Sequence, residues 1–314
     1  MRKLVIILVA VALLCSLFPS LSSAGPWTLN RNKLWMEVFT RYFASKMYWD
    51  SEYTRHEWQN NGRSAIWDLD IKFEYGLTDD LNILVGLPYA WSRWRNDWDE
   101  ATPGDNPKHE GFKSCSVGLK YKFMSKPAVA AGQIKFYLQP QHTDRTLAPD
   151  LSEYGDAIEL RGLLGNSWKV LGGRQFYMSA ESGYGFRTDW VNKSEYANWI
   201  PVFFEAGLAP VDRMMWKAEI DCYISDPATG IIKDTYTWRT GPIFIITGKG
   251  FNSIEKGEDA PDEGININLE LQYGRTFLGR GDPENREEIA PEPGGGSDKV
   301  SAAQEFIFKV QVLF

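Results

Sequence analysis

Charged residues recur at alternate positions in many segments of this chain, and they are the side chains best able to act on a solute. They include Glu37, Arg41, Asp68, Asp70, Lys72, Glu74, Lys120, Lys122, Lys135, Glu159, Arg161, Glu181, Glu205, Lys217, Glu219 and Asp221. Both signs are present, so two uses are open. The charges can line a path that filters polar or charged solutes, or they can satisfy one another in a polar plug.

Acid–base catalysis has fewer candidates. His56, His109 and His142 are the three histidines of the chain, and the tight cluster among them is His142-Thr143-Asp144, in which a hydroxyl and then an acid follow the base. Adjacent residues on an extended strand point to opposite faces, so this cluster does not build a nucleophile–base relay. We therefore predict that the protein is not an enzyme.

The elements that must position the charges are β-strands. In residues 65–77, Trp67, Leu69 and Ile71 share one face while Asp68 and Asp70 take the other, and a helix would scramble these two sets. A tight turn at residues 78–80 leads into residues 81–91, which alternate in the same way. The two segments predict a long β-hairpin.

The same alternation appears in ten further segments: residues 34–48, 114–124, 133–142, 156–165, 175–187, 199–209, 213–223, 235–247, 265–274 and 305–314. The charges named above fall on the polar face, with Trp35 and Phe39 as apolar exceptions, and residues 243–246 are apolar on both faces. Strands that are apolar outward and polar inward are the unit of a transmembrane β-barrel. We predict an all-β chain that forms a transmembrane antiparallel β-barrel of about 12 strands, roughly 10 to 14.

The two ends of the chain agree with an outer-membrane protein. Residues 1–24 have a basic start, an apolar run and a small-residue stretch, which predicts a cleaved signal peptide and a single barrel domain over residues 25–314. The last strand ends on Phe314, as in the terminal signal that bacterial barrels present to the barrel assembly machinery. An even number of strands would pair this strand with the one that begins near Leu34. We predict the outer membrane of a Gram-negative bacterium.

Connection lengths test the barrel prediction, because bacterial barrels have short periplasmic turns and longer extracellular loops. The expected extracellular loops are residues 49–63, 95–112, 143–155, 188–198, 224–234 and 279–299, and the short turns include 78–80, 125–131 and 210–212. Residues 248–263 are too long for a periplasmic turn and predict a flexible excursion. A secreted β-sandwich would alternate in the same way, but the loop lengths, the signal peptide and the final phenylalanine favour the membrane.

Composition narrows the partners. Aromatic residues make up 14% of the chain, with 13 Trp, as expected where aromatic girdles mark both membrane interfaces. Without Arg2 and Lys3 the formal charge moves from −7 to about −9, which disfavours a nucleic-acid partner. Cys115 and Cys222 fall on lipid-facing sides of strands far apart in the order, so we expect no disulfide. We also expect no cofactor and no metal.

The hairpin over residues 74–89, Glu-Tyr-Gly-Leu-Thr-Asp-Asp-Leu-Asn-Ile-Leu-Val-Gly-Leu-Pro-Tyr, is similar to one in a known family. It resembles the Tyr-Gly-Leu-Thr-Asp turn and Gly-x-Pro-Tyr strand of the meta-pathway phenol-degradation family of outer-membrane β-barrel proteins. The opening Gly25-Pro-Trp-Thr28 also looks like that group. The resemblance implies a barrel that moves small compounds, with aromatic ones as candidates, across the outer membrane.

The functional prediction is an outer-membrane channel for small solutes, aromatic or hydrophobic compounds among the candidates. The first alternative is a structural or adhesive surface barrel with an occluded lumen. An outer-membrane lipid hydrolase is a third, although the chain lacks the His-x-Ser-Asn-Gly segment of outer-membrane phospholipases. The expected partners are outer-membrane lipid and lipopolysaccharide, the barrel assembly machinery and a small-molecule solute.

Overall fold

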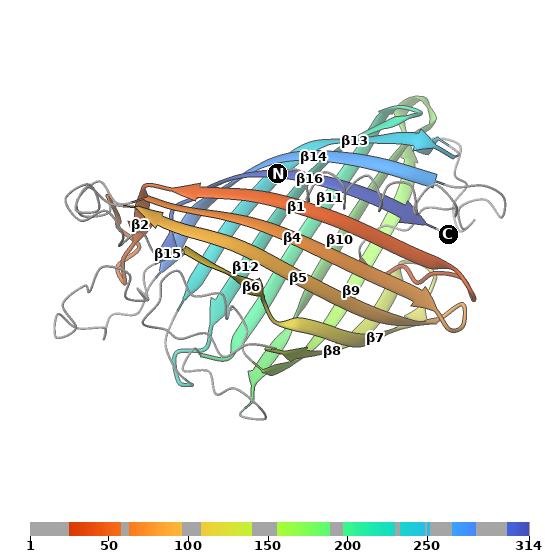
Figure 1. Ribbon diagram of the computed structural model, residues 1–314. Helices are drawn as coiled ribbons and strands as arrows, with labels where there is room; N and C mark the ends of the chain where they lie inside the picture. The colour runs from red at the N-terminus through yellow and green to blue at the C-terminus, as the bar shows by residue number, and fades with distance from the viewer. Residues whose placement is uncertain are drawn as a thin grey trace.

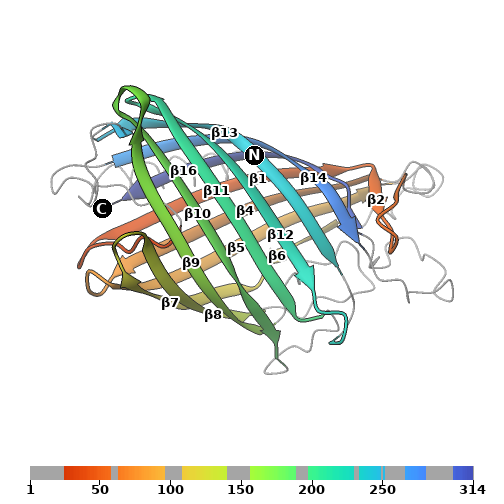
Figure 2. The ribbon, with the colours of Figure 1, turned by 180° about the vertical axis from the view of Figure 1, so that it is seen from behind.

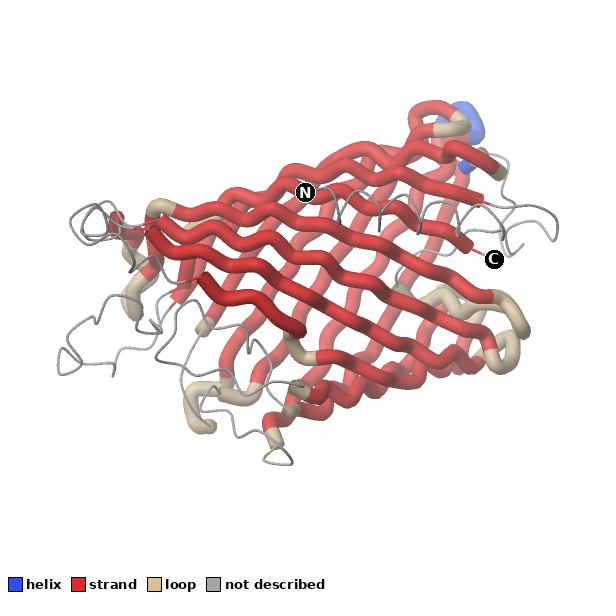
Figure 3. The backbone as a smooth tube through the Cα atoms, in the orientation of Figure 1, coloured by secondary structure: helices blue, strands red, loops and turns tan. Residues whose placement is uncertain are grey.

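The computed structural model of the chain is a closed barrel of long, tilted antiparallel β-strands (Figures 1 and 2). It describes residues 25–57, 63–95, 108–139, 156–188, 197–229, 233–248, 250–251, 266–280 and 300–313. Most of these residues lie in strands (Figure 3). None of the described segments is a helix long and apolar enough to cross a membrane.

Twelve strands of the described chain close the wall. They are β1 (Leu34–Ser45), β4 (Arg63–Gly76), β5 (Leu81–Arg95), β7 (Cys115–Met124), β8 (Val129–Leu138), β9 (Ala157–Val170), β10 (Arg174–Arg187), β11 (Trp199–Val211), β12 (Met214–Ser225), β13 (Asp234–Thr247), β14 (Asn266–Arg280) and β16 (Gln304–Leu313). Each pairs antiparallel with its neighbours in the order of the chain. The predicted fold class is therefore confirmed.

The first and last strands close the barrel. β1 pairs with β4 on one side and with β16 on the other, where Trp35 lies opposite Leu313 and Tyr42 opposite Phe306. Closure leaves no free strand edge, which is what a sheet needs inside a lipid bilayer. The predicted partnership between the terminal strand and the strand beginning near Leu34 is confirmed. Phe314 and the signal peptide at residues 1–24 lie outside the described residues.

Several boundaries differ from the sequence prediction. The predicted loop at residues 95–112 contains β6 (Lys108–Phe112), which pairs with β5. The strand predicted at 133–142 lies at β8, because Ala130 and Ala131 pair with β9 although such small residues show no alternation. β9 and β14 also extend beyond their predicted ends, and a 3-10 turn at Leu171–Gly173 follows β9.

A small sheet of β2 (Met47–Trp49), β3 (Arg55–Glu57) and β15 (Val300–Ser301) stands at the end of the barrel opposite the C-terminus (Figure 1). Part of the predicted loop at residues 49–63 is therefore paired. The short turns lie at the other end, with the C-terminus. Because bacterial barrels keep short turns in the periplasm, we call this the periplasmic end and the end with the small sheet the extracellular end.

The two faces of the wall differ as the alternation predicts. Large apolar side chains stay exposed on the outside, for example Tyr121, Phe123 and Phe306, which are 55%, 64% and 56% accessible. The ambiguous segment of β13 also divides cleanly. Ile243 and Ile245 are buried inside the barrel, whereas Phe244 and Ile246 are exposed outside it. A belt of exposed apolar side chains is stable only in contact with lipid.

The two cysteines behave as predicted. Cys115 lies on β7 and Cys222 on β12, both as free thiols. The four strands β8 to β11 separate them along the wall, which is much farther than a disulfide can reach.

Candidate functional site

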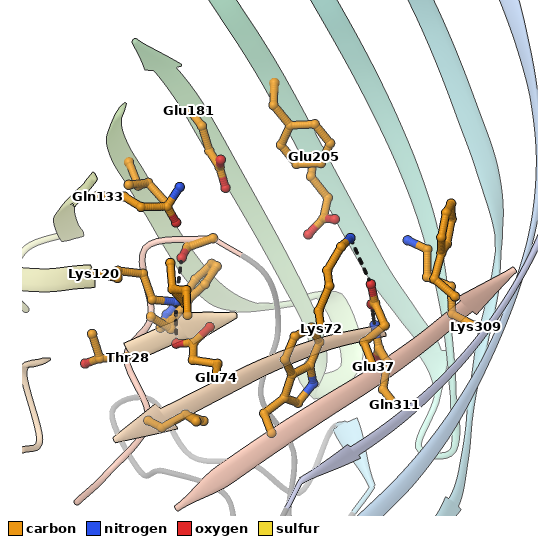
Figure 4. Close-up of a pocket in the computed structure, with 18 of the residues that line it drawn as sticks. Thr28, Glu37, Lys72, Glu74, Lys120, Gln133, Glu181, Glu205, Lys309 and Gln311 are labelled. Atoms are coloured by element: carbon orange, nitrogen blue, oxygen red, sulfur yellow. Dashed lines mark hydrogen bonds and ion pairs between the residues drawn. The ribbon is translucent and has the colours of Figure 1, made fainter. Parts of the chain in front are cut away.

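The candidate site is a cavity of about 1070 Å³ inside the barrel, lined by side chains from around the wall (Figure 4). Nearly all of the charged residues predicted to face the lumen line it: Glu37, Arg41, Asp68, Asp70, Lys72, Glu74, Lys120, Lys122, Lys135, Arg161, Glu181, Glu205, Lys217, Glu219 and Asp221. Glu159 also turns inward, but it is held in the wall beside Trp199 and Tyr137 and does not line the cavity.

Lys217 on β12 is the centre of the acidic part of the lumen. Its Nζ atom lies 2.6 Å from Glu219 Oε1, 2.6 Å from Glu270 Oε1 and 3.2 Å from Glu205 Oε2. Glu205 and Glu219 stand directly opposite each other in the β11–β12 ladder, where two like charges repel. The ammonium between them therefore holds this part of the wall together, and the hydroxyl of Tyr177 also donates to Glu205 at 2.7 Å.

Further ion pairs continue this network onto β13 and β16. Lys309 Nζ lies 3.3 Å from Glu270, and Arg239 contacts Glu305 at 3.0 Å and Asp221 at 2.9 Å. All five side chains project into the lumen from neighbouring strands. The network therefore fixes charged groups at defined positions along one side of the cavity.

The β1–β4 side of the lumen carries a second network. Lys72 Nζ lies 3.2 Å from Glu37 Oε1, and the Gln311 amide donates to the other oxygen of Glu37 at 2.9 Å (Figure 4). Nearer the extracellular end, the guanidinium of Arg41 donates through two nitrogens to one carboxylate oxygen of Asp68. Lys72 is the accessible member, with 44% of its side chain exposed to the lumen.

The β7–β10 side is built around Lys120 and Arg161. Lys120 Nζ lies 2.6 Å from Glu74 Oε1, and Arg161 contacts Glu159 at 2.6 Å and Glu181 at 3.2 Å. Lys135 on β8 also lines the cavity on this side, yet it makes no ion pair with any described residue.

The periplasmic end of the lumen is narrowed by the chain itself. Residues 25–30 run inside the barrel, where Lys120 Nζ donates to the Gly25 carbonyl at 3.3 Å and Trp27 packs edge-on against Tyr177 at 6.0 Å. Thr28 lies beside Lys120 and Glu74 (Figure 4). Phe251 is buried among inward side chains of β10 to β13. The charged cavity therefore ends, on the periplasmic side, at a layer of aromatic and aliphatic groups.

The predicted excursion at residues 248–263 is described only at Gly248, Gly250 and Phe251, so its character beyond them stays a prediction. A side chain at Gly250 would collide with the carboxylate of Asp212, and the Phe251 amide donates to the Asp212 carbonyl at 2.6 Å. These contacts bring the chain back against the β11–β12 turn. Phe251 thereby reaches the lumen.

Sequence reasoning missed several functional groups. Six residues that belong to these networks or line the cavity were not in the set of charges predicted to face the lumen. They are Arg239, Glu270, Glu305, Lys309, Gln311 and Lys113. Glu270, Glu305 and Lys309 carried a usable signal, because each alternates with apolar residues in a recognised strand. Arg239 carried a weaker one, since Gly241 and Pro242 interrupt the pattern of β13.

The candidate catalytic bases are not assembled into a site within the described residues. His56 Nε2 lies 2.7 Å from Asp50 Oδ2, and its ring packs on Tyr48. His142 and the side chain of His109 lie outside the described residues. No group of three or more His, Cys, Asp and Glu side chains in the described ranges is arranged to hold a metal ion.

No protein-family model and no curated protein matches the sequence. Among solved structures, the COG4313 outer membrane channel from Pseudomonas putida F1 is similar over 94% of this chain and 99% of its own, with 11% identity and a TM-score of 0.58. The translocator domain of the autotransporter NalP from Neisseria meningitidis matches 91% of this chain and 89% of its own, with 9% identity and a TM-score of 0.41. The first likeness shows a shared fold. This chain therefore has the closed β-barrel fold of that outer membrane channel.

Proposed function

We propose that this barrel is a channel that passes small solutes across the outer membrane by diffusion or weak binding. The observation that carries the proposal is the cavity of about 1070 Å³ inside the closed wall, lined by charged side chains of both signs. A barrel filled by packed side chains would leave no such space. The Pseudomonas putida barrel of the same fold is described as an outer membrane channel, in agreement with this role.

The lining supports small solutes that are polar but carry an apolar part. Phe39, Tyr177 and Phe203 line the cavity among the charges, and such rings offer contact surface to an aromatic solute. This agrees with the resemblance of residues 74–89 to the meta-pathway phenol-degradation family. We propose membership of that family, and aromatic compounds as one solute class, on these two grounds.

The alternative is a structural or adhesive barrel whose lumen stays closed. Residues 25–30 and Phe251, which narrow the periplasmic end, support this second candidate. In either case we propose that lipopolysaccharide and phospholipid surround the exposed apolar belt. We also propose that the assembly machinery recognises the last strand. The hydrolase alternative gains no support from His56, whose described contacts are with Asp50 and Tyr48.

Liposome swelling separates the two candidates. Purified barrel in liposomes is tested with a neutral sugar, with benzoate and with phenol, and liposomes without protein correct for passive leakage of phenol. A channel gives swelling that falls as solute size increases. Failure of every solute to enter through the protein contradicts the channel and leaves the closed barrel.

The proposed assembly signal has its own test. Deletion of Phe314 should reduce the amount of folded barrel in the outer membrane several-fold and leave the conductance of each folded molecule unchanged. The folded fraction is measured by heat-modifiable gel mobility and the conductance in planar bilayers. A normal folded fraction would show that Phe314 is not a signal.

A further inference from the structure

Lys135, which forms no ion pair with any residue that the structure describes, stands in a part of the lumen where the carboxylates are already occupied. Glu159 lies directly opposite it in the β8–β9 ladder. Its Oε1 accepts hydrogen bonds from Arg161 at 2.6 Å and Tyr137 at 3.2 Å, and its Oε2 accepts from Arg161 at 3.0 Å and Trp199 at 3.1 Å. A carboxylate has about four lone-pair sites, so Glu159 has none left for Lys135.

Two other acids on this side of the lumen are also engaged. Glu181 accepts from Arg161 at 3.2 Å, and Glu74 is paired with Lys120 at 2.6 Å. Arg161 and Lys120 are therefore neutralised locally, whereas the charge of Lys135 is not. A cation that lies inside a protein without a counter-ion is costly unless an anion can reach it.

Gln133 adds an unused hydrogen-bond donor at the same place. It lies two residues before Lys135 on β8, on the same face, and both line the cavity. Its Nε2 atom is buried and has no hydrogen-bond partner within the described structure. Gln133 and Lys120 project into the cavity opposite Lys72 and Glu37 (Figure 4). An unsatisfied buried donor beside an unpaired ammonium is the arrangement that an oxyanion would complete.

The backbone leaves room for this arrangement. Gly118 lies opposite Lys135 in the β7–β8 ladder, and a side chain there would meet Lys135 Cγ at 2.9 Å. The stem of Lys135 therefore lies over a glycine. A side chain at Gly118 would also collide with the Ile134 carbonyl oxygen, so only glycine leaves the Lys135 stem in this position.

We propose that Lys135 and Gln133 form a binding site for the oxyanion group of a small solute, a carboxylate or a phosphate, inside the lumen. The site rests on the proposed channel function and assigns it a solute class. The ammonium supplies the charge and the Gln133 amide supplies a directed hydrogen bond. The remaining part of the solute lies in the cavity, toward Lys72 and Phe39.

Calorimetric titration of the purified barrel in detergent tests the site, with empty micelles as the blank. Benzoate and benzamide have nearly the same shape and differ in charge. We expect benzoate to bind the wild-type barrel at least about tenfold more tightly than benzamide, because an ion pair stabilises only the anion. Inorganic phosphate as a competitor shows whether the organic part of the solute contributes to binding.

Variants then assign the binding to these residues. Lys135→Gln should weaken benzoate binding to the level of benzamide, and Lys135→Arg should keep it. Lys169→Gln is the matched control, because it removes the same charge from an exposed position on β9 that does not line the cavity. Gln133→Leu, which removes only the amide, should weaken benzoate binding several-fold and serves as the second variant should Lys135→Gln fail to fold. Heat-modifiable mobility confirms the fold of each.

Two results would overturn the site: equal binding of benzoate and benzamide to the wild type, or unchanged benzoate binding by folded Lys135→Gln. Conduction is measured separately, by swelling of liposomes that contain the wild-type barrel with a neutral sugar. Absence of swelling with intact benzoate binding contradicts the channel and leaves the anion site standing. Swelling without benzoate binding contradicts the anion site and leaves the channel standing.

Discussion

At the residue scale, the ion pairs of Lys217 give a prediction about the stability of the barrel. Three glutamates lie within 3.2 Å of its ammonium, and all four side chains are at most 5% accessible. Replacing Lys217 by methionine keeps the stem but leaves Glu205, Glu219 and Glu270 without their central cation. Removal of one partner from a buried ion pair costs about 3–5 kcal/mol, so we expect a loss of that size in the free energy of unfolding. Urea unfolding in lipid vesicles, followed by tryptophan fluorescence, measures it.

Lys122→Met is the matched control for Lys217. Lys122 pairs with Asp80 at 3.2 Å near the periplasmic turn, where the Asp80 side chain is 54% accessible. An exposed pair of this kind contributes about 0–1 kcal/mol. Equal losses in the two variants would show that water reaches the glutamate cluster and screens it.

Asp50 gives a prediction about pH at the extracellular end. Burial raises the pKa of its carboxyl, but hydrogen bonds from the Thr54 amide, from His56 and from the Glu52 amide outweigh burial and bring the pKa below its usual value of 3.8. Because the folded pKa is depressed, the stabilisation is present above pH 3.8 and is lost as the pH falls through the folded pKa. Titration of the carboxyl signal by NMR should show a midpoint below 3.8.

A substitution mimics the protonated state of Asp50 at neutral pH. Asp50→Asn removes the charge that holds the Glu52 and Thr54 amides, each 2.8 Å from Asp50 Oδ1. We expect trypsin to cleave after Arg55 several-fold faster in this variant than in the wild type. Glu52→Gln, which also removes one negative charge from the turn, should not change the rate. Identical rates for Asp50→Asn and the wild type would refute a role of Asp50 in holding the turn.

At the element scale, β4 tests which face of the wall meets lipid. Ile71 lies on the apolar face between Val38 and Leu87 of the neighbouring strands, whereas Asp70 lines the lumen. An arginine near the bilayer midplane costs about 2–4 kcal/mol, so Ile71→Arg should lower stability in lipid vesicles by that amount. Asp70→Arg should be tolerated. Similar effects of the two substitutions would contradict the assigned faces.

The strands are the part of the fold that the sequence predicts well. Alternation assigns one face to lipid and the other to the lumen, and an even number of strands requires β1 to meet β16. The boundaries are predicted less well where the residues are small, as at Ala130 and Ala131, because alternation is visible only when successive side chains differ in polarity. The position of Arg239 on the lumen face was not predicted, for a related reason. Gly241 and Pro242 follow it and interrupt the pattern on which its facing depends.

The candidate site is only partly predictable, because its properties depend on contacts between distant segments. The sequence indicates that Lys135 faces the lumen. It does not indicate that Trp199 and Tyr137 occupy the oxygens of Glu159, and this occupation is what leaves Lys135 without a partner. Likewise, Gly25 contacts Lys120 across 95 positions of the chain. No local pattern around Pro26 or Trp27 predicts that they lie inside the barrel.

At the scale of the whole molecule, the closed wall sets the width of the lumen, and the segment at residues 25–30 occupies part of it. Pro26 is fully buried, and Trp27 packs against Tyr177 of β10. Neither Pro26 nor Trp27 belongs to a wall strand, so removal of these two residues leaves the hydrogen bonds between the wall strands intact. The segment therefore narrows the lumen without being needed to close the barrel.

A chain that begins at Asn30, produced without residues 1–29 and refolded, tests this narrowing. We expect its single-channel conductance in planar bilayers to exceed that of the chain beginning at Gly25 several-fold, because ion flow through a pore rises with its open cross-section. Trp27→Phe, which keeps an aromatic ring against Tyr177, should conduct like the wild type. If the shortened chain conducts no better than the full one, then Phe251 and its neighbours, rather than residues 25–30, set the limiting width.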